Sequence, residues 1–244
     1  MPPQVFIIEG EIGAGKTELA LGLAGALRAR GVEVALALEP VELWKQSGIL
    51  ELFYADPARY AYAFQTYVFA TRVAAINAAL AATPGAHVAL LERSPATDQI
   101  FMELQRDQVS PVEMAMYYTW CGEYARLLPL DLATARVLYL KPDIAVCMAR
   151  VAGRHRAGEV GDDARVGDDA PQSGGVTRDY QLRLRRAHEA FFQGLHHGEF
   201  PHLPVCPFLD VTEISGANAA ADFRLDGADH GRVIGAVLAE MGFA

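Results

Sequence analysis

The segment GEIGAGKT, from Gly10 to Thr17, has the spacing G-x-x-x-x-G-K-[ST]. Its glycines let backbone N–H groups turn toward phosphate oxygens, the Lys16 ammonium can reach the outer phosphates, and the Thr17 hydroxyl is placed to ligate Mg²⁺. A chance glycine-rich turn is the alternative, but the motif follows an apolar run and opens a helical pattern, which favours a phosphate loop. The residues that we expect to contact the nucleotide here are Gly10, Gly13, Ala14, Gly15, Lys16 and Thr17.

Two carboxylates stand at the ends of apolar runs: Glu39 ends VEVALAL, and Glu92 follows HVALL. Ligand sites of open parallel sheets lie at the carboxyl ends of strands, so we expect both side chains to face the phosphate loop. One acid could hold the metal and the other could take a proton from an attacking hydroxyl, and a phosphotransferase needs both tasks done. Acids that merely cap turns are the alternative, which is weaker for two such residues than for one.

Arginines cluster in MARVAGRHRAGE, at Arg150, Arg154 and Arg156. They stand at a helix end without acidic partners one turn away, and they lead into a polar segment. We therefore expect a lid whose arginines close over the transferring phosphate and neutralise its developing charge. A solvated basic helix face is the plain alternative.

The elements that must position these groups alternate between short apolar strands and longer helices, which predicts an α/β fold with a parallel sheet between helices. The expected strands begin at Val5, Val32, His87, Arg136 and Val205. The expected helices follow Thr17 and cover residues 57–82, 111–128, 142–156, 177–197 and 231–242. The prolines at expected first helical turns, where a missing N–H is tolerated, are Pro57, Pro111 and Pro142. The aromatic residues of 57–82 assigned to the core are Tyr60, Tyr62 and Phe69.

The chain of 244 residues suits one domain spanning 1–244. One segment, AGEVGDDARVGDDAPQSGG at 157–175, is rich in glycine and aspartate and repeats VGDDA. This composition predicts a flexible lid insertion within the domain rather than a linker between two cores.

The composition narrows the class of protein. Thirty acidic against 21 basic residues give a net charge of −9, which argues against a broad nucleic-acid or anionic-membrane footprint. No apolar run is long enough to span a bilayer. The cysteines Cys121, Cys147 and Cys206 lie far apart, and we expect them as buried thiols inside helices or strands of a cytoplasmic protein, without disulfides or zinc.

Six segments in this order resemble the deoxyribonucleoside kinases of the deoxycytidine/deoxyguanosine kinase type. They are GEIGAGKT, EPVELW from Glu39, FYADPARYAYAFQTYVFATR from Phe53, ERSPATD from Glu92, RVAGRHRAGE from Arg150 and PVCPFLDV from Pro204. The resemblance covers most of the chain from Gln4 to about Ile214. It implies a P-loop kinase fold with a five-stranded parallel sheet and a lid, ATP as phosphate donor with Mg²⁺, a small deoxynucleoside as acceptor, and a homodimer.

The resemblance also implies roles for single residues. Glu39 is similar to the general base that activates the sugar 5′-hydroxyl, with Arg93 beside it and Lys16 on the donor phosphates, while Thr17 and Glu92 resemble the Mg²⁺ side. The residues expected around the acceptor are Tyr54 and Glu159 at the 3′-hydroxyl, Gln65 at the base edge, Trp44 as a pocket wall, and Arg72 and Asp98 in the base pocket. Arg154 and Arg156 resemble the lid arginines.

Arg72 and Asp98 bear on which base is accepted. A carboxylate held by arginine can accept from the exocyclic amine of cytosine or adenine, and the arginine can donate to guanine, whereas thymine offers that carboxylate a carbonyl. We therefore expect deoxycytidine and purine deoxynucleosides as substrates, with thymidine poor. An ordinary surface salt bridge, worth little, is the bland alternative.

The chain departs from the family pattern in two places. The family often has a base-stacking aromatic shortly after ERS; this chain has Met102 there, with Phe101 adjacent, and its Asp/Gly insertion is long. The herpesviral thymidine-kinase branch is a poorer match, because it carries Asp-Arg-His where this chain has Glu-Arg-Ser.

A nucleoside-monophosphate kinase is an alternative that would need a second anion site, and a thymidine-preferring kinase is another. A nucleotide-binding switch would need N-K-x-D, which is missing from the sequence.

Overall fold

The computed structural model describes residues 2–154, 159, 175–194, 200, 202–204, 206–208, 210–214 and 227–243. Most of the predicted insertion and residues 215–226 lie outside these ranges. Arg156, predicted as a lid residue, also lies outside the described residues, whereas Arg154 and Glu159 lie within them.

The strands form one five-stranded sheet in the order β2-β3-β1-β4-β5, and every neighbouring pair is parallel. This confirms the predicted α/β P-loop fold. The strands are β1 (Gln4–Gly10), β2 (Val34–Ala37), β3 (Val88–Glu92), β4 (Arg136–Leu140) and β5 (Asp210–Ile214). In the register, Ile8 of β1 stands beside Glu92, and Gly10 stands beside Leu140. The phosphate loop therefore leaves the sheet between the ends of β3 and β4.

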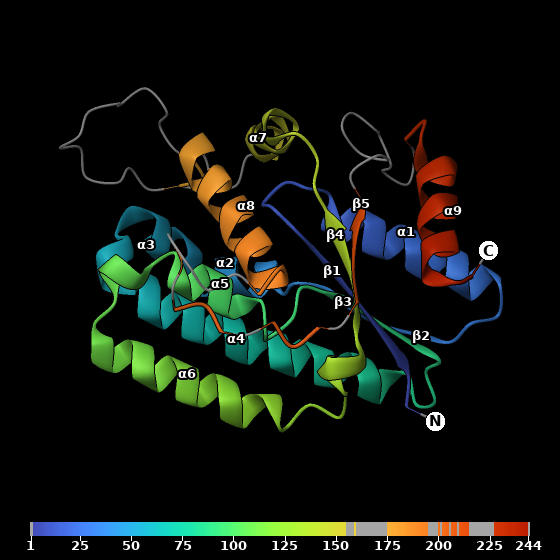
Figure 1. Ribbon diagram of the computed structural model, residues 1–244, viewed down its shortest axis with the longest axis horizontal. Helices are drawn as coiled ribbons and strands as arrows, with labels where there is room; N and C mark the ends of the chain where they lie inside the picture. The colour runs from blue at the N-terminus through green and yellow to red at the C-terminus, as the bar shows by residue number, and fades with distance from the viewer. Residues whose placement is uncertain are drawn as a thin grey trace.

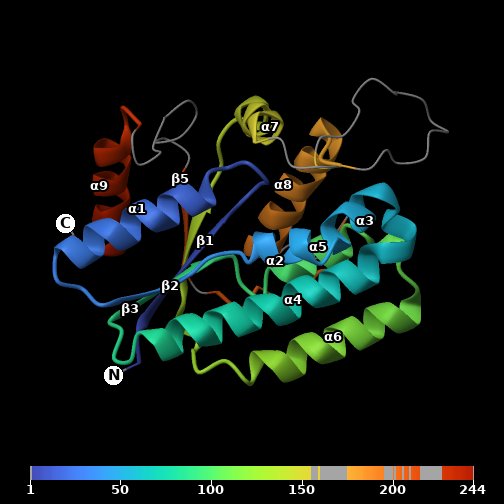
Figure 2. The ribbon, with the colours of Figure 1, turned by 180° about the vertical axis from the view of Figure 1, so that it is seen from behind.

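Helices cover both faces of the sheet, because side chains alternate along β1. Phe6 and Ile8 pack with α1 (Lys16–Ala29) and α9 (His230–Met241), which lie together on one face in Figures 1 and 2. Val5 and Ile7 belong to the core on the opposite face, where they pack with residues of α4 (Pro57–Ala82), α6 (Pro111–Ala125) and α8 (Arg178–Phe192). The remaining helices are α2 (Val41–Gln46), α3 (Ile49–Ala55), α5 (Asp98–Glu103) and α7 (Ile144–Gly153), with the 3₁₀ turns η1 (Arg106–Gln108) and η2 (Leu132–Thr134).

Helix starts follow local capping chemistry. The Asp56 side chain accepts from the Arg59 N–H before α4, and Ser110 forms a capping box with Glu113 before α6, which confirms the starts predicted from Pro57 and Pro111. The start predicted at Pro142 was wrong. Helix α7 begins at Ile144, because the Asp143 side chain accepts from the Ala145 N–H and caps the helix after the proline.

The second half of the chain departs from prediction at several ends. The strand predicted from Val205 begins instead at Asp210. The helix predicted over 177–197 is α8, which ends at Phe192. Cys121 and Cys147 are free buried thiols within α6 and α7, but Cys206 is half-buried and lies in neither a helix nor a strand.

Two further observations complete the fold. Phe69 of α4 is buried as predicted, whereas Tyr60 and Tyr62 are only half-buried and pack against the edge of the core. Within the described part of the chain, none of the helices combines the length and the apolar character that crossing a bilayer requires.

Candidate active site

The phosphate loop connects β1 to α1 through positions that only glycine fills. Gly10 has a φ of 151°, and a Cβ there would lie 2.5 Å from the Leu140 carbonyl oxygen. Gly13 has a φ of 84°, and a Cβ there would lie 2.5 Å from the Cys147 carbonyl oxygen. Both positions combine a left-handed backbone with close backbone neighbours, so the loop conformation depends on them.

Lys16 folds back over this loop. Its Nζ donates to the carbonyl oxygens of Glu11 at 3.0 Å and Gly10 at 3.3 Å. Burial, followed by the charge of Arg93, lowers the Lys16 pKa to about 8. The ammonium is therefore held by weak neutral acceptors that phosphate oxygens can replace with stronger, charge-assisted bonds.

Helices α7 and α8 hold the loop from behind. Arg150 Nη1 donates to the Ala14 carbonyl oxygen at 2.9 Å, so this residue braces the loop, a contact that the lid interpretation did not include. Gln181 contacts both polar groups of Ile12: its Oε1 accepts from the Ile12 N–H at 3.2 Å and its Nε2 donates to the Ile12 carbonyl oxygen at 2.5 Å. The sequence analysis missed Gln181, whose amide carries no motif.

One cavity of about 910 Å³ runs from the loop to the helices of the opposite core. It brings together most of the predicted site. The predicted residues that line it are Gly13, Gly15, Lys16, Thr17, Glu39, Trp44, Tyr54, Gln65, Arg72, Glu92, Arg93, Asp98, Arg154 and Glu159. Gly10 and Ala14, also predicted, are buried within the phosphate loop and are not among the residues that line the cavity.

Glu92 and Thr17 meet at the end of the cavity that the phosphate loop lines. Glu92 Oε1 accepts from Thr17 Oγ1 at 2.7 Å, and Glu92 Oε2 accepts from the Glu39 N–H at 3.3 Å. Burial, followed by the neighbouring charge of Glu39, raises the pKa of Glu92. A carboxylate and a hydroxyl in contact are hard oxygen donors, and Mg²⁺ is typically held by such groups together with substrate phosphates. The residues present therefore fit the ion.

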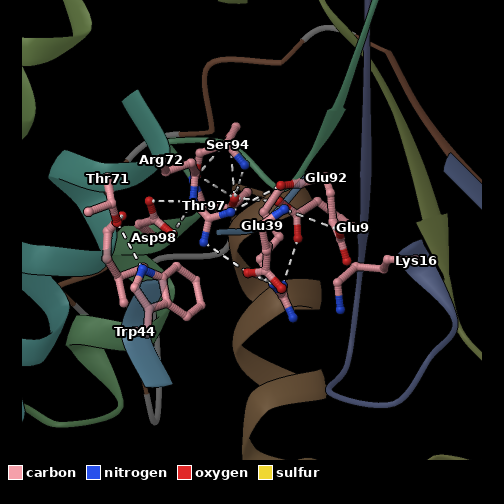
Figure 3. A network of polar contacts seen from close by, with 12 residues as sticks. Glu9, Lys16, Glu39, Trp44, Thr71, Arg72, Glu92, Ser94, Thr97 and Asp98 are labelled. Atoms are coloured by element: carbon pink, nitrogen blue, oxygen red, sulfur yellow. Dashed lines mark hydrogen bonds and ion pairs between the residues drawn. The ribbon is translucent and has the colours of Figure 1, made fainter. Parts of the chain in front are cut away.

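Arg72 is the centre of the ion-pair network in Figure 3. Its Nε contacts both carboxylate oxygens of Asp98, at 3.0 and 2.9 Å. Its Nη1 donates to the Glu92 carbonyl oxygen at 3.0 Å, and its Nη2 donates to Glu39 Oε1 at 2.9 Å. One buried guanidinium thus joins Asp98, which the family resemblance predicts at the base, to Glu39, which it predicts at the 5′-hydroxyl.

Glu39 lies two residues beyond β2, between two arginines. Besides Arg72, it meets Arg93, whose Nε lies 3.3 Å from Glu39 Oε1. Burial would raise the pKa of Glu39, but the charges of Arg72, Arg93 and Lys16 outweigh burial and hold this pKa at about 2. The carboxylate is therefore ionised throughout the neutral range and accepts hydrogen bonds only.

At Asp98, in contrast to Glu39, burial outweighs the neighbouring positive charge in setting the pKa. Its side chain is 1% exposed, and burial raises its pKa to about 6 even though Arg72 counteracts that rise. Asp98 and Glu39 share one arginine but have well-separated pKa values, which is typical of a functional site.

The walls of the cavity are aromatic. Trp44 Nε1 donates to Thr71 Oγ1 at 2.8 Å, which fixes the indole (Figure 3). Phe101 lines the cavity, and the guanidinium carbon of Arg93 lies 4.6 Å from its ring centroid. Met102, at the position where the family often has an aromatic, is fully buried and is not among the lining residues. The aromatic side chain at the cavity is thus displaced by one residue.

The lid edge of the cavity contains Tyr54, Arg154 and Glu159. Glu159 is buried, and Arg154 binds both of its oxygens, with Nε at 2.8 Å from Oε2 and Nη2 against Oε1. No acidic residue stands four positions from the arginines of this segment, as expected, but Glu159 pairs with Arg154 from five positions further along the chain.

Comparison with known proteins gives matches over most of the chain. A family model described as deoxynucleoside kinase matches residues 6–213. The chain is 30% identical over 151 residues to a probable deoxycytidine kinase of fowlpox virus, covering 61% of this chain and 60% of the relative. It is 32% identical over 163 residues to a thymidine kinase of ictalurid herpesvirus 1, covering 64% and 66%. It is 28% identical over 236 residues to deoxycytidine kinase 2 of Gallus gallus, covering 84% and 81%. The first two matches thus span less than two thirds of the relative's length.

Proposed function

Because the chain belongs to the deoxynucleoside kinase family, we propose that it transfers the terminal phosphate of ATP to the 5′-hydroxyl of a deoxynucleoside. The observation that carries the proposal is that the phosphate loop and the ionised Glu39 carboxylate line the same cavity. A donor phosphate on Lys16 and an acceptor hydroxyl on Glu39 would therefore face one another across that cavity. Positioning and charge stabilisation supply most of the catalysis in phosphoryl transfer.

Glu39 accepts a hydrogen bond from the 5′-hydroxyl and then its proton. A carboxylate with a pKa near 2 is a weak base, so it first orients the hydroxyl. The hydroxyl becomes strongly acidic as its oxygen bonds to phosphorus, and at that point the proton passes to Glu39. Arg93 and Lys16 bring positive charge to the transferring phosphate. Mg²⁺, which Thr17 and Glu92 would hold, supplies charge neutralisation on the donor phosphates when it is bound.

We propose deoxycytidine and purine deoxynucleosides as the substrates. The support is the buried contact of both Asp98 oxygens with Arg72 at the cavity, together with Gln65, which is 3% exposed and also lines it. An ionised Asp98 accepts from an exocyclic amine, whereas the O4 carbonyl of thymine would face a carboxylate. A pocket that leaves a buried polar group unpaired discriminates strongly against the mismatched substrate.

We also propose that the protein is a homodimer that uses the outer face of α6. Val112, Met116 and Trp120 follow one another at helical spacing there and are 70%, 46% and 45% exposed. Such a stripe of large apolar side chains fits a self-complementary contact between two copies. Sedimentation of the protein and of a Met116→Lys, Trp120→Lys variant tests this, because only the variant should be monomeric.

Steady-state ADP release tests the proposed reaction. The protein is assayed with ATP, Mg²⁺ and each of the four deoxynucleosides, and separately with the four deoxynucleoside monophosphates. We expect release that requires a deoxynucleoside, with deoxycytidine and the purines well ahead of thymidine. Release only with monophosphates would contradict the reaction. Thymidine at the level of deoxycytidine would contradict the base pocket and leave the reaction standing.

A further inference from the structure

Glu9 is a buried acid directly below the phosphate loop. It is 0% exposed, precedes Gly10 on β1, and is not among the residues that line the cavity. Its Oε2 accepts from Arg93 Nη1 at 2.9 Å, and its Oε1 accepts from Thr97 Oγ1. Burial would raise the pKa of Glu9, but contacts with His188 and Arg93 outweigh burial and lower it. Glu9 therefore carries a charge inside the protein, and that charge faces Arg93.

Arg93 needs such an anchor, because it has an unfavourable backbone. Its φ of 63° makes it the only non-glycine residue with a positive φ in the described part of the chain. A non-glycine residue in this region is strained and persists only where its surroundings hold it. The Arg93 N–H donates to the Ile8 carbonyl oxygen at 3.0 Å, and its side chain extends between Glu9 and Glu39.

Arg93 contacts Glu9 through Nη1 and Glu39 through Nε, and this arrangement determines which oxygen of Glu39 can bind a substrate. Arg72 Nη2 and Arg93 Nε both approach the same oxygen, Glu39 Oε1, at 2.9 and 3.3 Å. Among the described residues, neither arginine donates a hydrogen bond to Glu39 Oε2. One oxygen of the carboxylate is thus held by two cations, and the other is left for a hydroxyl.

His188 supports Glu9 from α8. Its Nδ1 lies 2.8 Å from the Leu184 carbonyl oxygen, so Nδ1 carries a hydrogen and donates it. Its Nε2 lies 3.6 Å from Glu9 Oε2, and its ring stacks on Tyr139 with centroids 5.7 Å apart. The ring is 0% exposed and has no room to leave this position without disturbing the core.

We propose that Glu9, supported by His188, is a positioning residue for phosphoryl transfer. It holds one arm of Arg93 so that this guanidinium cannot pair with both oxygens of Glu39. Without Glu9, Arg93 would be free to turn and form the bidentate pair that arginine and carboxylate favour. That pair would occupy the oxygen that receives the 5′-hydroxyl. The inference rests on the proposed role of Glu39 as the base.

Glu9→Gln tests this, with Thr97→Val as the matched control on the other oxygen of Glu9. Glu9→Gln keeps the shape and removes the charge that holds Arg93. We expect kcat to fall by about 10²-fold, the cost of misplacing a reacting group, while KM for ATP and for the deoxynucleoside changes little. Thr97→Val keeps the charge and the Arg93 contact, so it should lower Tm and leave kcat nearly unchanged. Equal kcat losses in both variants, or no loss in Glu9→Gln, would overturn the proposal.

A second pair decides the matter if Glu9→Gln does not fold. His188→Gln places an amide N–H near the Nε2 position, which lies 3.6 Å from Glu9 Oε2, and His188→Leu leaves that position apolar at similar volume. We expect kcat to be retained in His188→Gln and lost in His188→Leu, and equal kcat in the two would overturn the proposal. Glu39→Gln separates this inference from the proposed function. If Glu39→Gln keeps its kcat, the base assignment fails; if it loses kcat while Glu9→Gln does not, only the present inference fails.

Discussion

The two ends of the cavity are built in different ways. At the donor end, one continuous segment from Gly10 to Thr17 supplies the phosphate loop, and its shape depends on backbone conformation at glycines. At the acceptor end, Glu39, Arg72 and Asp98 come from three separate segments and meet through buried ion pairs. A backbone site is a local property, so changing one side chain should alter its chemistry more than its stability. A network of buried charges is cooperative, so removing one partner leaves another charge uncompensated.

The largest effect should come from the acceptor end. Glu39→Gln keeps the shape and removes the base, so we expect kcat to fall by roughly 10²–10⁴-fold, the usual worth of a positioned acid–base group. Deoxynucleoside affinity should change far less, because the amide still lines the cavity. Steady-state kinetics together with equilibrium binding of the deoxynucleoside checks this. Lost binding with retained kcat would make Glu39 a binding residue instead.

At the donor end, Lys16→Ala should lower kcat by about 10²–10³-fold, comparable to removing one donor to a developing charge. The fold should survive, because Lys16 contacts only loop carbonyls among the hydrogen bonds of the described residues. Turnover and thermal unfolding are measured on the same sample. A near-normal kcat would mean that the loop is not the donor site, and a collapsed Tm would erase the contrast between the two ends.

Arg72→Met with Asp98→Ala should change base preference. We expect the kcat/KM of thymidine to rise relative to that of deoxycytidine by about tenfold or more, because the group that repels the thymine carbonyl is gone. Absolute kcat should fall as well, since Arg72 also holds Glu39. Asp98→Asn keeps that arginine and is the matched control for kcat. An unchanged thymidine-to-deoxycytidine ratio in both variants would contradict the pocket assignment.

The pH dependence of the preference for deoxycytidine over thymidine should follow the ionisation of Asp98 rather than that of Glu39. Asp98, with a pKa of about 6, is ionised above that pH and protonated below it, whereas Glu39, with a pKa of about 2, stays ionised throughout. Between pH 7 and 5.5 we expect kcat/KM for deoxycytidine to fall several-fold relative to that for thymidine, because a protonated Asp98 no longer accepts twice and can donate to a carbonyl. Asp98→Asn should abolish the difference between the two profiles. Parallel profiles for both nucleosides in the unmutated protein would refute this.

The smallest effect should come from outside both ends. Deleting most of residues 161–174 should leave a folded and at least partly active kinase, because so polar and glycine-rich a segment adds little to a core and surface loops tolerate changes in length. Circular dichroism and the ADP-release assay check this. Unfolding, or complete loss of activity, would make the segment a third essential region.

Local chemistry made much of this protein readable from its sequence. The phosphate loop, the starts of α4 and α6, and the carboxylates at the ends of β2 and β3 each depend on residues within a turn or a strand of one another. Alternating strand and helix patterns likewise predicted a parallel sheet, since such strands are buried on both faces and need helical crossovers. The family resemblance added Arg72 and Asp98 as a pair, although not the third contact from Arg72 to Glu39.

Only the tertiary structure decided which residues of distant segments contact one another. Glu9 contacts Arg93 and His188, and Gln181 hydrogen-bonds to Ile12, although these partners lie far apart in the sequence and no periodicity or motif links them. These contacts exist because parallel crossovers bring the ends of β1 and β3 side by side and lay α8 over them. A buried acid in an apolar strand looks the same in the sequence whether it is paired or not. Its partner is set by the packing of the whole sheet, and so is the oxygen of Glu39 that stays open.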